Sequence, residues 1–144
     1  MTYLSTLVQF LDQNLASSGY DDSSQNGLQV EASRQDIVKI GLAVDSGLSV
    51  LEKAVSAGCQ MLIVHHGLFW KNSPNLSGVM GKKVRTLIEG NCSLYASHLP
   101  LDGHPELGNN AEIVRLLGAK LSTPFCYSGQ KTIGYVGEFS EPIN

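Results

Sequence analysis

The sequence predicts an α/β fold in which a mainly parallel sheet is flanked by helices. Three short apolar runs occur at residues 37–44, 61–64 and 93–96, and segments with helical periodicity separate them. An alternation of strand, helix, strand, helix and strand gives parallel strands joined by right-handed crossovers. The length of 144 residues is enough to bury a core. We therefore expect one domain that spans residues 1–144.

The first element expected is an amphipathic helix near residues 2–17. Its apolar residues follow the spacing i, i+3, i+4, i+7 and are Leu4, Leu7, Val8, Leu11 and Leu15. The polar stretch that follows, from Gly19 to Gly27, predicts a loop. The apolar run of residues 37–44 is typical of a strand that is covered on both faces.

The middle of the chain predicts two further strands, each preceded by a helix. Asp45 and Ser46 are suitable N-cap residues for a helix that ends at Gly58. The run of residues 61–64 then predicts a buried strand, which ends at His65 and His66. A helix over Val84, Leu87 and Ile88 is terminated by Gly90, and the strand of residues 93–96 ends at Ser97 and His98.

Two elements are expected in the last third of the chain. A helix is predicted from Gly108 and Asn109 to Gly118, because Ile113, Leu116 and Leu117 form its apolar stripe. Residues 133–137 predict a final strand, and their glycines suggest a place near the edge of a sheet.

Composition and charge exclude several classes of protein. Charged residues make up 16% of the chain, against roughly 25% in an ordinary soluble protein. This low fraction suggests that part of the surface is buried against other subunits or further chain. The 10 basic and 13 acidic residues give no overall basic footprint for nucleic acid.

The chain is expected to be cytoplasmic and to have no membrane partner. Its first basic residue is Arg34, so residues 1–18 lack the basic start of a signal peptide. No apolar run approaches the roughly 18 residues of a membrane span. The three cysteines are widely spaced, which is typical of reduced, mostly structural thiols.

Metal-ligating side chains follow the predicted strands at the points where those strands end. Open parallel sheets bind ligands at the carboxyl ends of their strands, and these ends carry Asp45, His65–His66 and His98. Asp102 lies four residues after His98, and Pro100 between them predicts an extended or turned connection. Imidazole and carboxylate together suit a divalent zinc, iron, manganese or cobalt ion.

A structural role is the competing interpretation of these histidines. A lone histidine is more often structural than a ligand, and adjacent residues on a regular strand point to opposite faces. At a strand end the backbone can turn, so the pair is able to serve two neighbouring ions. Clustering at two strand ends favours metal binding. We expect His104, in a loop between Gly103 and Pro105, to be exposed to solvent.

Three motifs together resemble one known family. They are His65-His66-Gly67-Leu68-Phe69-Trp70, then Ser97-His98-Leu99-Pro100-Leu101-Asp102, and Gly108-Asn109-Asn110. The stretch Ser24-Gln25-Asn26-Gly27-Leu28-Gln29-Val30 is similar to the N-terminal motif of the same family, although serine or glutamine replaces its usual aspartate. The chain is identified as a member of the Nif-three-like dinuclear metal-centre family, often labelled GTP cyclohydrolase I type 2.

The resemblance implies a two-metal site and a Nif-three-like fold, of which this chain is the N-terminal part. His65 and His66 would each bind one divalent ion, and Asp102 would bind one of the two. His98 would line the site as a weak ligand or as a neighbour of the ligands. Family members are longer, form ring-like hexamers, and complete the site with a C-terminal histidine and glutamate.

This chain has no histidine after His104, so its own site is expected to be incomplete and its metal occupancy weak or partial. Tight binding of two ions per chain after dialysis, measured by elemental analysis, would contradict that expectation.

The activity that the resemblance implies is metal-dependent hydrolysis of a nucleotide, such as opening of a purine ring. His98 is the candidate catalytic residue, because imidazole can transfer protons near neutral pH. Trp70 would stack on a base or serve only in packing. The alternative is a non-catalytic metal-binding scaffold or regulatory protein that acts through a protein or nucleic-acid partner.

Overall fold

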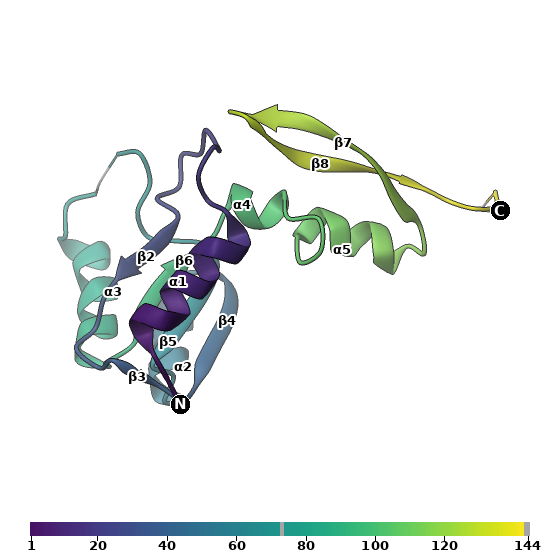
Figure 1. Ribbon diagram of the computed structural model, residues 1–144. Coiled ribbons are helices and arrows are strands. Elements are labelled where there is room, and N and C mark those ends of the chain that lie inside the picture. The colour runs from purple at the N-terminus through teal and green to yellow at the C-terminus, as the bar shows by residue number, and fades with distance from the viewer. Residues whose placement is uncertain (73, 143–144) are drawn as a thin grey trace. The chain divides into compact units, whose positions relative to one another are not determined.

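A computed structural model of the chain describes residues 1–72 and 74–142 (Figure 1). They form two compact units. The first contains Met1–Asn14 and Ser23–His98, and the second contains Leu15–Asp22 and the described part of Leu99–Asn144. The single domain expected over residues 1–144 stays a prediction.

The first unit is built on a four-stranded, mainly parallel sheet. Its strands, in spatial order, are β2 (Gly27–Val30), β6 (Ser93–Ala96), β5 (Met61–His66) and β4 (Ile40–Asp45). β4, β5 and β6 are parallel neighbours, whereas β2 pairs with β6 in the antiparallel direction. The predicted α/β class with a mainly parallel sheet is confirmed. β2 was not predicted: its first residue, Gly27, ends the expected loop, and residues 28–30 were assigned to no element.

Helices α2 (Leu48–Ser56) and α3 (Gly78–Glu89) make the crossovers between the parallel strands, as predicted. They pack on one face of the sheet around a core that includes Leu51, Leu62, Val64, Leu87 and Leu94. Burying each such side chain stabilises the fold by roughly 1.5–3 kcal/mol. Gly58, which follows α2, has φ +75°, a left-handed conformation that suits glycine at a helix end.

Helix α1 (Leu4–Leu15) confirms the first predicted helix and crosses the sheet in Figure 1. The hydroxyl of Tyr95 on β6 donates a hydrogen bond to Asp12 on α1 at 2.8 Å. Tyr95 itself is fully buried, so α1 covers the sheet at β6. Two short strands, β1 (Thr2–Tyr3) and β3 (Asp36–Ile37), pair beside its start.

Strand β4 differs from the prediction that both of its faces are covered. It is an edge strand, and Leu42 and Val44 are 78% and 62% exposed. Only Gly41 and Ala43 lie on the side of the α2 core. An apolar run cannot tell an edge strand from a central one, because residue type does not specify which elements cover each face.

One local prediction about a helix end was wrong. The N-cap of α2 is Gly47 rather than Asp45 or Ser46, and it makes no side-chain capping bond. The segment that contains Pro100, predicted to be extended or turned, is a single helical turn, α4 (Leu99–Asp102). Proline is compatible with this turn because the first residues of a helix need no backbone N–H partner within it.

The second unit contains α4, α5 (Asn109–Leu116) and a hairpin of β7 (Lys120–Ser128) and β8 (Lys131–Glu138). Helix α5 and the strand at residues 133–137 were predicted. β7 was missed, because Pro124 and the small polar residues Ser122 and Thr123 obscure its strand pattern. The hydroxyl of Tyr135 donates to the carbonyl of Gly103 at 2.7 Å and ties the hairpin to the end of α4.

Among the described residues, every helix is too short or too polar to cross a membrane. All three cysteines are free thiols: Cys59 and Cys92 are buried, and Cys126 is exposed.

The buried thiol of Cys92 provides a test of this packing. Burial, and to a smaller extent Cys59 nearby, raises the pKa of Cys92 to about 11 from its ordinary 9.0. The folded state favours the protonated thiol, so this contribution to stability is complete below pH 9.0 and is lost as the pH rises through about 11. We expect a thiol reagent at about pH 8 to modify Cys126 rapidly and Cys92 only on unfolding.

The control for this labelling is Cys126→Ser, in which rapid modification should disappear. Rapid modification of Cys92 in the folded Cys126→Ser variant would contradict the prediction.

Candidate metal centre

Three histidines meet at the carboxyl ends of two adjacent parallel strands. His65 and His66 are the last residues of β5, and His98 follows β6 after one intervening residue. One ring nitrogen from each lies within 4.8 Å of those of the other two. The parallel register that pairs Val64 with Ala96 brings these ends to the same edge of the sheet. All three histidines are half-buried.

The rings of the adjacent pair lie on the same side, although both residues belong to β5. The ring centroids of His65 and His66 are 4.5 Å apart, and those of His65 and His98 are 4.9 Å apart. A regular strand would send adjacent side chains to opposite faces. The end of β5 therefore departs from that alternation and brings both rings toward His98.

Hydrogen bonds at Nδ1 hold two of the three rings. Nδ1 of His65 lies 3.0 Å from the carbonyl oxygen of Ser97, and Nδ1 of His66 lies 2.7 Å from Oδ1 of Asp45. A carbonyl and a carboxylate only accept hydrogen bonds, so each Nδ1 is the donor. The sequence placed Asp45 at a strand end but did not reveal these contacts.

Gln29 on β2 holds the loop that directly follows His66. Its Oε1 accepts hydrogen bonds from the N–H groups of Leu68 at 2.6 Å and Phe69 at 3.2 Å, while its Nε2 donates to the carbonyl of Phe69 at 3.2 Å. Gly67 lies against this amide so closely that a Cβ there would collide with it. The side chain of Gln29 thereby substitutes for backbone pairing in the loop.

The neighbouring residue Asn26 holds the segment of the third histidine. Its Oδ1 accepts a hydrogen bond from the backbone N–H of His98 at 2.7 Å. Gly27, between these two polar residues, has φ +107°, a conformation that favours glycine. The short motif from Asn26 to Gln29 thus supports both histidine-bearing segments. In the sequence, the sign of this role is the presence of two polar residues directly before and within a β-strand.

The indole ring of Trp70 lies beside the histidine cluster. Its ring centroid lies 5.2 Å from that of His98 in an edge-on arrangement and 6.4 Å from that of His66. The indole N–H donates to the carbonyl of Gly67 at 3.2 Å, which fixes the ring orientation.

The two remaining candidates belong to the second compact unit. Asp102, the last residue of α4, accepts a hydrogen bond from Nδ2 of Asn109 at 2.9 Å. His104 is half-buried rather than exposed, and its Nδ1 accepts from the N–H groups of Glu106 and Leu107 at 3.1 and 3.0 Å. This bonding makes His104 a structural cap, and the ligand role of Asp102 stays a prediction.

The histidine cluster fits a divalent metal. Metal-binding histidines characteristically donate one ring N–H to a carboxylate or a backbone carbonyl, which leaves the other nitrogen for the ion. His66 with Asp45 and His65 with Ser97 show these two kinds of partner. Three imidazoles suit zinc, iron or cobalt.

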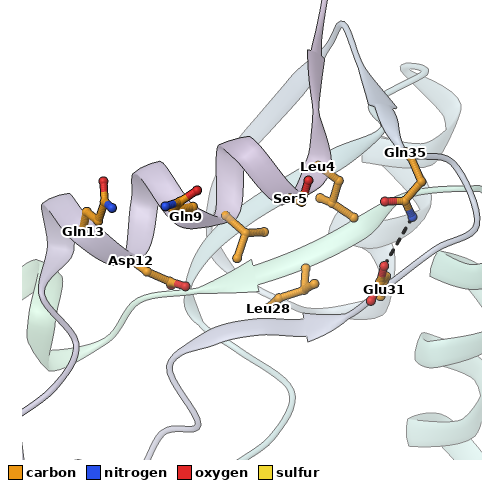
Figure 2. A pocket seen from close by; sticks show the side chains of 9 residues that line it. Leu4, Ser5, Gln9, Asp12, Gln13, Leu28, Glu31 and Gln35 are labelled. Atoms are coloured by element: carbon orange, nitrogen blue, oxygen red, sulfur yellow. Dashed lines mark hydrogen bonds between the residues drawn. The ribbon is translucent and has the colours of Figure 1, made fainter.

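A separate pocket of about 380 Å³ lies between α1 and β2, and its lining includes none of the histidines (Figure 2). Leu4, Val8 and Leu28 form its apolar part. At its rim, Nε2 of Gln35 donates to the carboxylate of Glu31 at 3.3 Å. Its mixed lining carries no group suited to acid–base or metal chemistry apart from the carboxylates of Asp12 and Glu31.

The fold and the cluster define an α/β protein with a candidate metal centre at the carboxyl edge of a parallel sheet. The chain belongs to the Duf34/NIF3 (NGG1p interacting factor 3) family, whose model matches residues 2–144.

Relatives named "GTP cyclohydrolase 1 type 2 homolog" support the assignment. The protein of Pyrococcus abyssi is 44% identical over 137 residues, which cover 94% of this chain and 54% of the relative. The protein of Archaeoglobus fulgidus is 41% identical over 150 residues, which cover 97% of this chain and 60% of the relative. The chain thus spans little more than half the length of these relatives.

Solved structures show the same fold. A Thermus thermophilus protein superimposes with a TM-score of 0.82 and 42% identity, covering 86% of this chain and 51% of that one. A protein called ybgI, described as of unknown function, has a TM-score of 0.80 and 40% identity, covering 85% and 50%.

The contacts of Gln29 predict the effect of its removal. Gln29→Ala leaves the N–H groups of Leu68 and Phe69 without this acceptor, which should destabilise the first unit by about 1–3 kcal/mol in urea unfolding. Gln29→Glu keeps a side-chain oxygen at the same distance from the backbone, so it should lower the free energy of unfolding less than Gln29→Ala does. Equal stability of the Gln29→Ala variant and the original protein would show that the amide does not hold the loop.

Proposed function

We propose that the protein is a metal-dependent hydrolase that acts on a nucleotide, by purine ring opening or a related hydrolysis. The observation that carries this proposal is the convergence of His65, His66 and His98 within 4.8 Å at the sheet edge. The shared name of the relatives, "GTP cyclohydrolase 1 type 2 homolog", supports the choice of a nucleotide.

In this proposal His65, His66 and Asp102 hold two divalent ions of zinc, iron, manganese or cobalt. When bound, such a pair supplies a water molecule whose pKa is lowered toward neutrality. His65 and His66 are suited to this role because each uses Nδ1 in a hydrogen bond to an acceptor-only partner.

His98 is the residue to which we assign proton transfer. Its ring lies 5.7 Å from that of His66 and 4.9 Å from that of His65, and Asn26 anchors its backbone. Imidazole both accepts and donates protons near neutral pH, as ring-opening hydrolysis requires. Trp70, held by Gly67, offers an aromatic surface for the base beside His98.

A second function, a non-catalytic metal-binding scaffold, is favoured by the exposed apolar side chains. Leu42 and Val44 alternate along the edge strand β4 on the same face, and they are 78% and 62% exposed. Contiguous exposed apolar surface marks sites of association. The scaffold would act through protein or nucleic-acid partners. In either function we propose that the protein assembles as a ring-like homohexamer in the cytoplasm.

Formate release from GTP tests the enzymatic proposal. The full-length protein, loaded separately with zinc, iron, manganese or cobalt, is incubated with GTP, and loss of the purine absorbance is followed in parallel. We expect turnover with at least one metal. His66→Ala should abolish turnover because it removes a ligand, whereas His98→Ala should lose turnover by a factor of about 10²–10⁴ while retaining metal.

The control is His104→Asn, which changes the histidine outside the cluster and keeps an acceptor for the turn. It should retain full turnover. Unchanged GTP in the presence of metal, with occupancy verified by elemental analysis, would contradict the hydrolase proposal and favour the scaffold.

A further inference from the structure

Asp45 lies beside His66 because of the parallel pairing of β4 with β5. Five residue pairs define the register, from Ile40 with Met61 to Asp45 with His66. The backbone N–H of Ser46 donates to the carbonyl of His66 at 3.2 Å and anchors the strand ends. This arrangement brings Oδ1 of Asp45 to 2.7 Å from Nδ1 of His66.

The contact determines where the imidazole proton resides. A carboxylate has no hydrogen to donate, so a hydrogen bond at 2.7 Å requires the proton to be on Nδ1 of His66. In a neutral ring Nε2 then carries the lone pair. A metal ion binds that lone pair, whereas a proton on Nε2 would block it.

We propose that Asp45 is a positioning residue that holds His66 in the Nδ1–H tautomer and thereby prepares Nε2 as a metal ligand. This inference rests on the metal centre of the proposed function. A carboxylate partner also fixes the orientation of the imidazole ring it contacts.

A purely structural ion pair is the competing explanation, and exposure distinguishes the two. The side chains of Asp45 and His66 are 67% and 43% exposed. Ion pairs at such positions contribute little to folding because water screens them. Removal of the Asp45 carboxylate should therefore change the state of His66 while leaving the thermal unfolding midpoint nearly unchanged.

The experiment compares the 144-residue chain with Asp45→Ala, Asp45→Asn and a charge-matched control, Glu52→Gln. Glu52 lies on α2 with a side chain that is 50% exposed, and its carboxylate is 3.8 Å from Nζ of Lys82. Asp45→Asn keeps the shape of the side chain, but its amide can donate a hydrogen bond to Nδ1 and so permits the opposite tautomer.

The first measurement is the tautomer of His66 in the metal-free protein, read from long-range ¹⁵N–¹H NMR correlations at alkaline pH, where imidazole is neutral. We expect the Nδ1–H form in the original protein and in Glu52→Gln. We expect a substantial Nε2–H population in both Asp45 variants. The Nδ1–H form persisting in Asp45→Ala would overturn the proposal.

The second measurement is the affinity for zinc and cobalt by competition with a chromophoric chelator. Loss of such a supporting carboxylate typically weakens metal binding by about 10–100-fold, and we expect this loss in both Asp45 variants and none in Glu52→Gln. Equal affinity in Asp45→Ala and the original protein would overturn the role of Asp45 alone. Equal affinity in His66→Ala and the original protein would instead overturn the metal centre itself.

Discussion

The candidate site depends on the parallel register of β4, β5 and β6. Pairing runs from Ile40 with Met61 to Asp45 with His66, and from Met61 with Ser93 to Val64 with Ala96. A shift by one residue would send every side chain of a strand to the opposite face. The buried apolar residues of β5 and β6 oppose such a shift, because it would remove Leu62, Val64 and Leu94 from the core that packs against α2 and α3. The core therefore determines which polar groups meet at the sheet edge.

A second set of contacts comes from β2 and from the residue directly before it, neither of which adds a histidine. Gln29 pairs with the loop after His66, and Asn26 binds the backbone of His98. Backbone groups in loops cannot use the regular ladder of a sheet, so they need side-chain or water partners. These two residues meet that need for both histidine-bearing segments at once. These contacts also constrain the sequence: a Cβ at position 67 would collide with the amide of Gln29, so this position requires glycine.

Much of the fold followed from local patterns. Helices α1, α2, α3 and α5 appear in the periodicity of apolar residues, and α2, α3 and α5 end within two residues of the glycines predicted to stop them. The chain direction of β4, β5 and β6 followed from their alternation with helices. The exposed face of β4, the strand nature of β2 and the strand β7 did not follow. Coverage and edge position depend on neighbours distant in the chain, which residue type does not encode.

The sequence by itself determined the α/β class and the presence of histidines at two strand ends, because both follow from short-range patterns of apolar residues. It also indicated that His104 is separate from the other three. Only the tertiary structure decided which atoms meet: Asp45 with His66, 21 residues apart, and Gln29 with Leu68, 39 residues apart. Such contacts depend on strand order and register, which arise only when the whole sheet packs around its core.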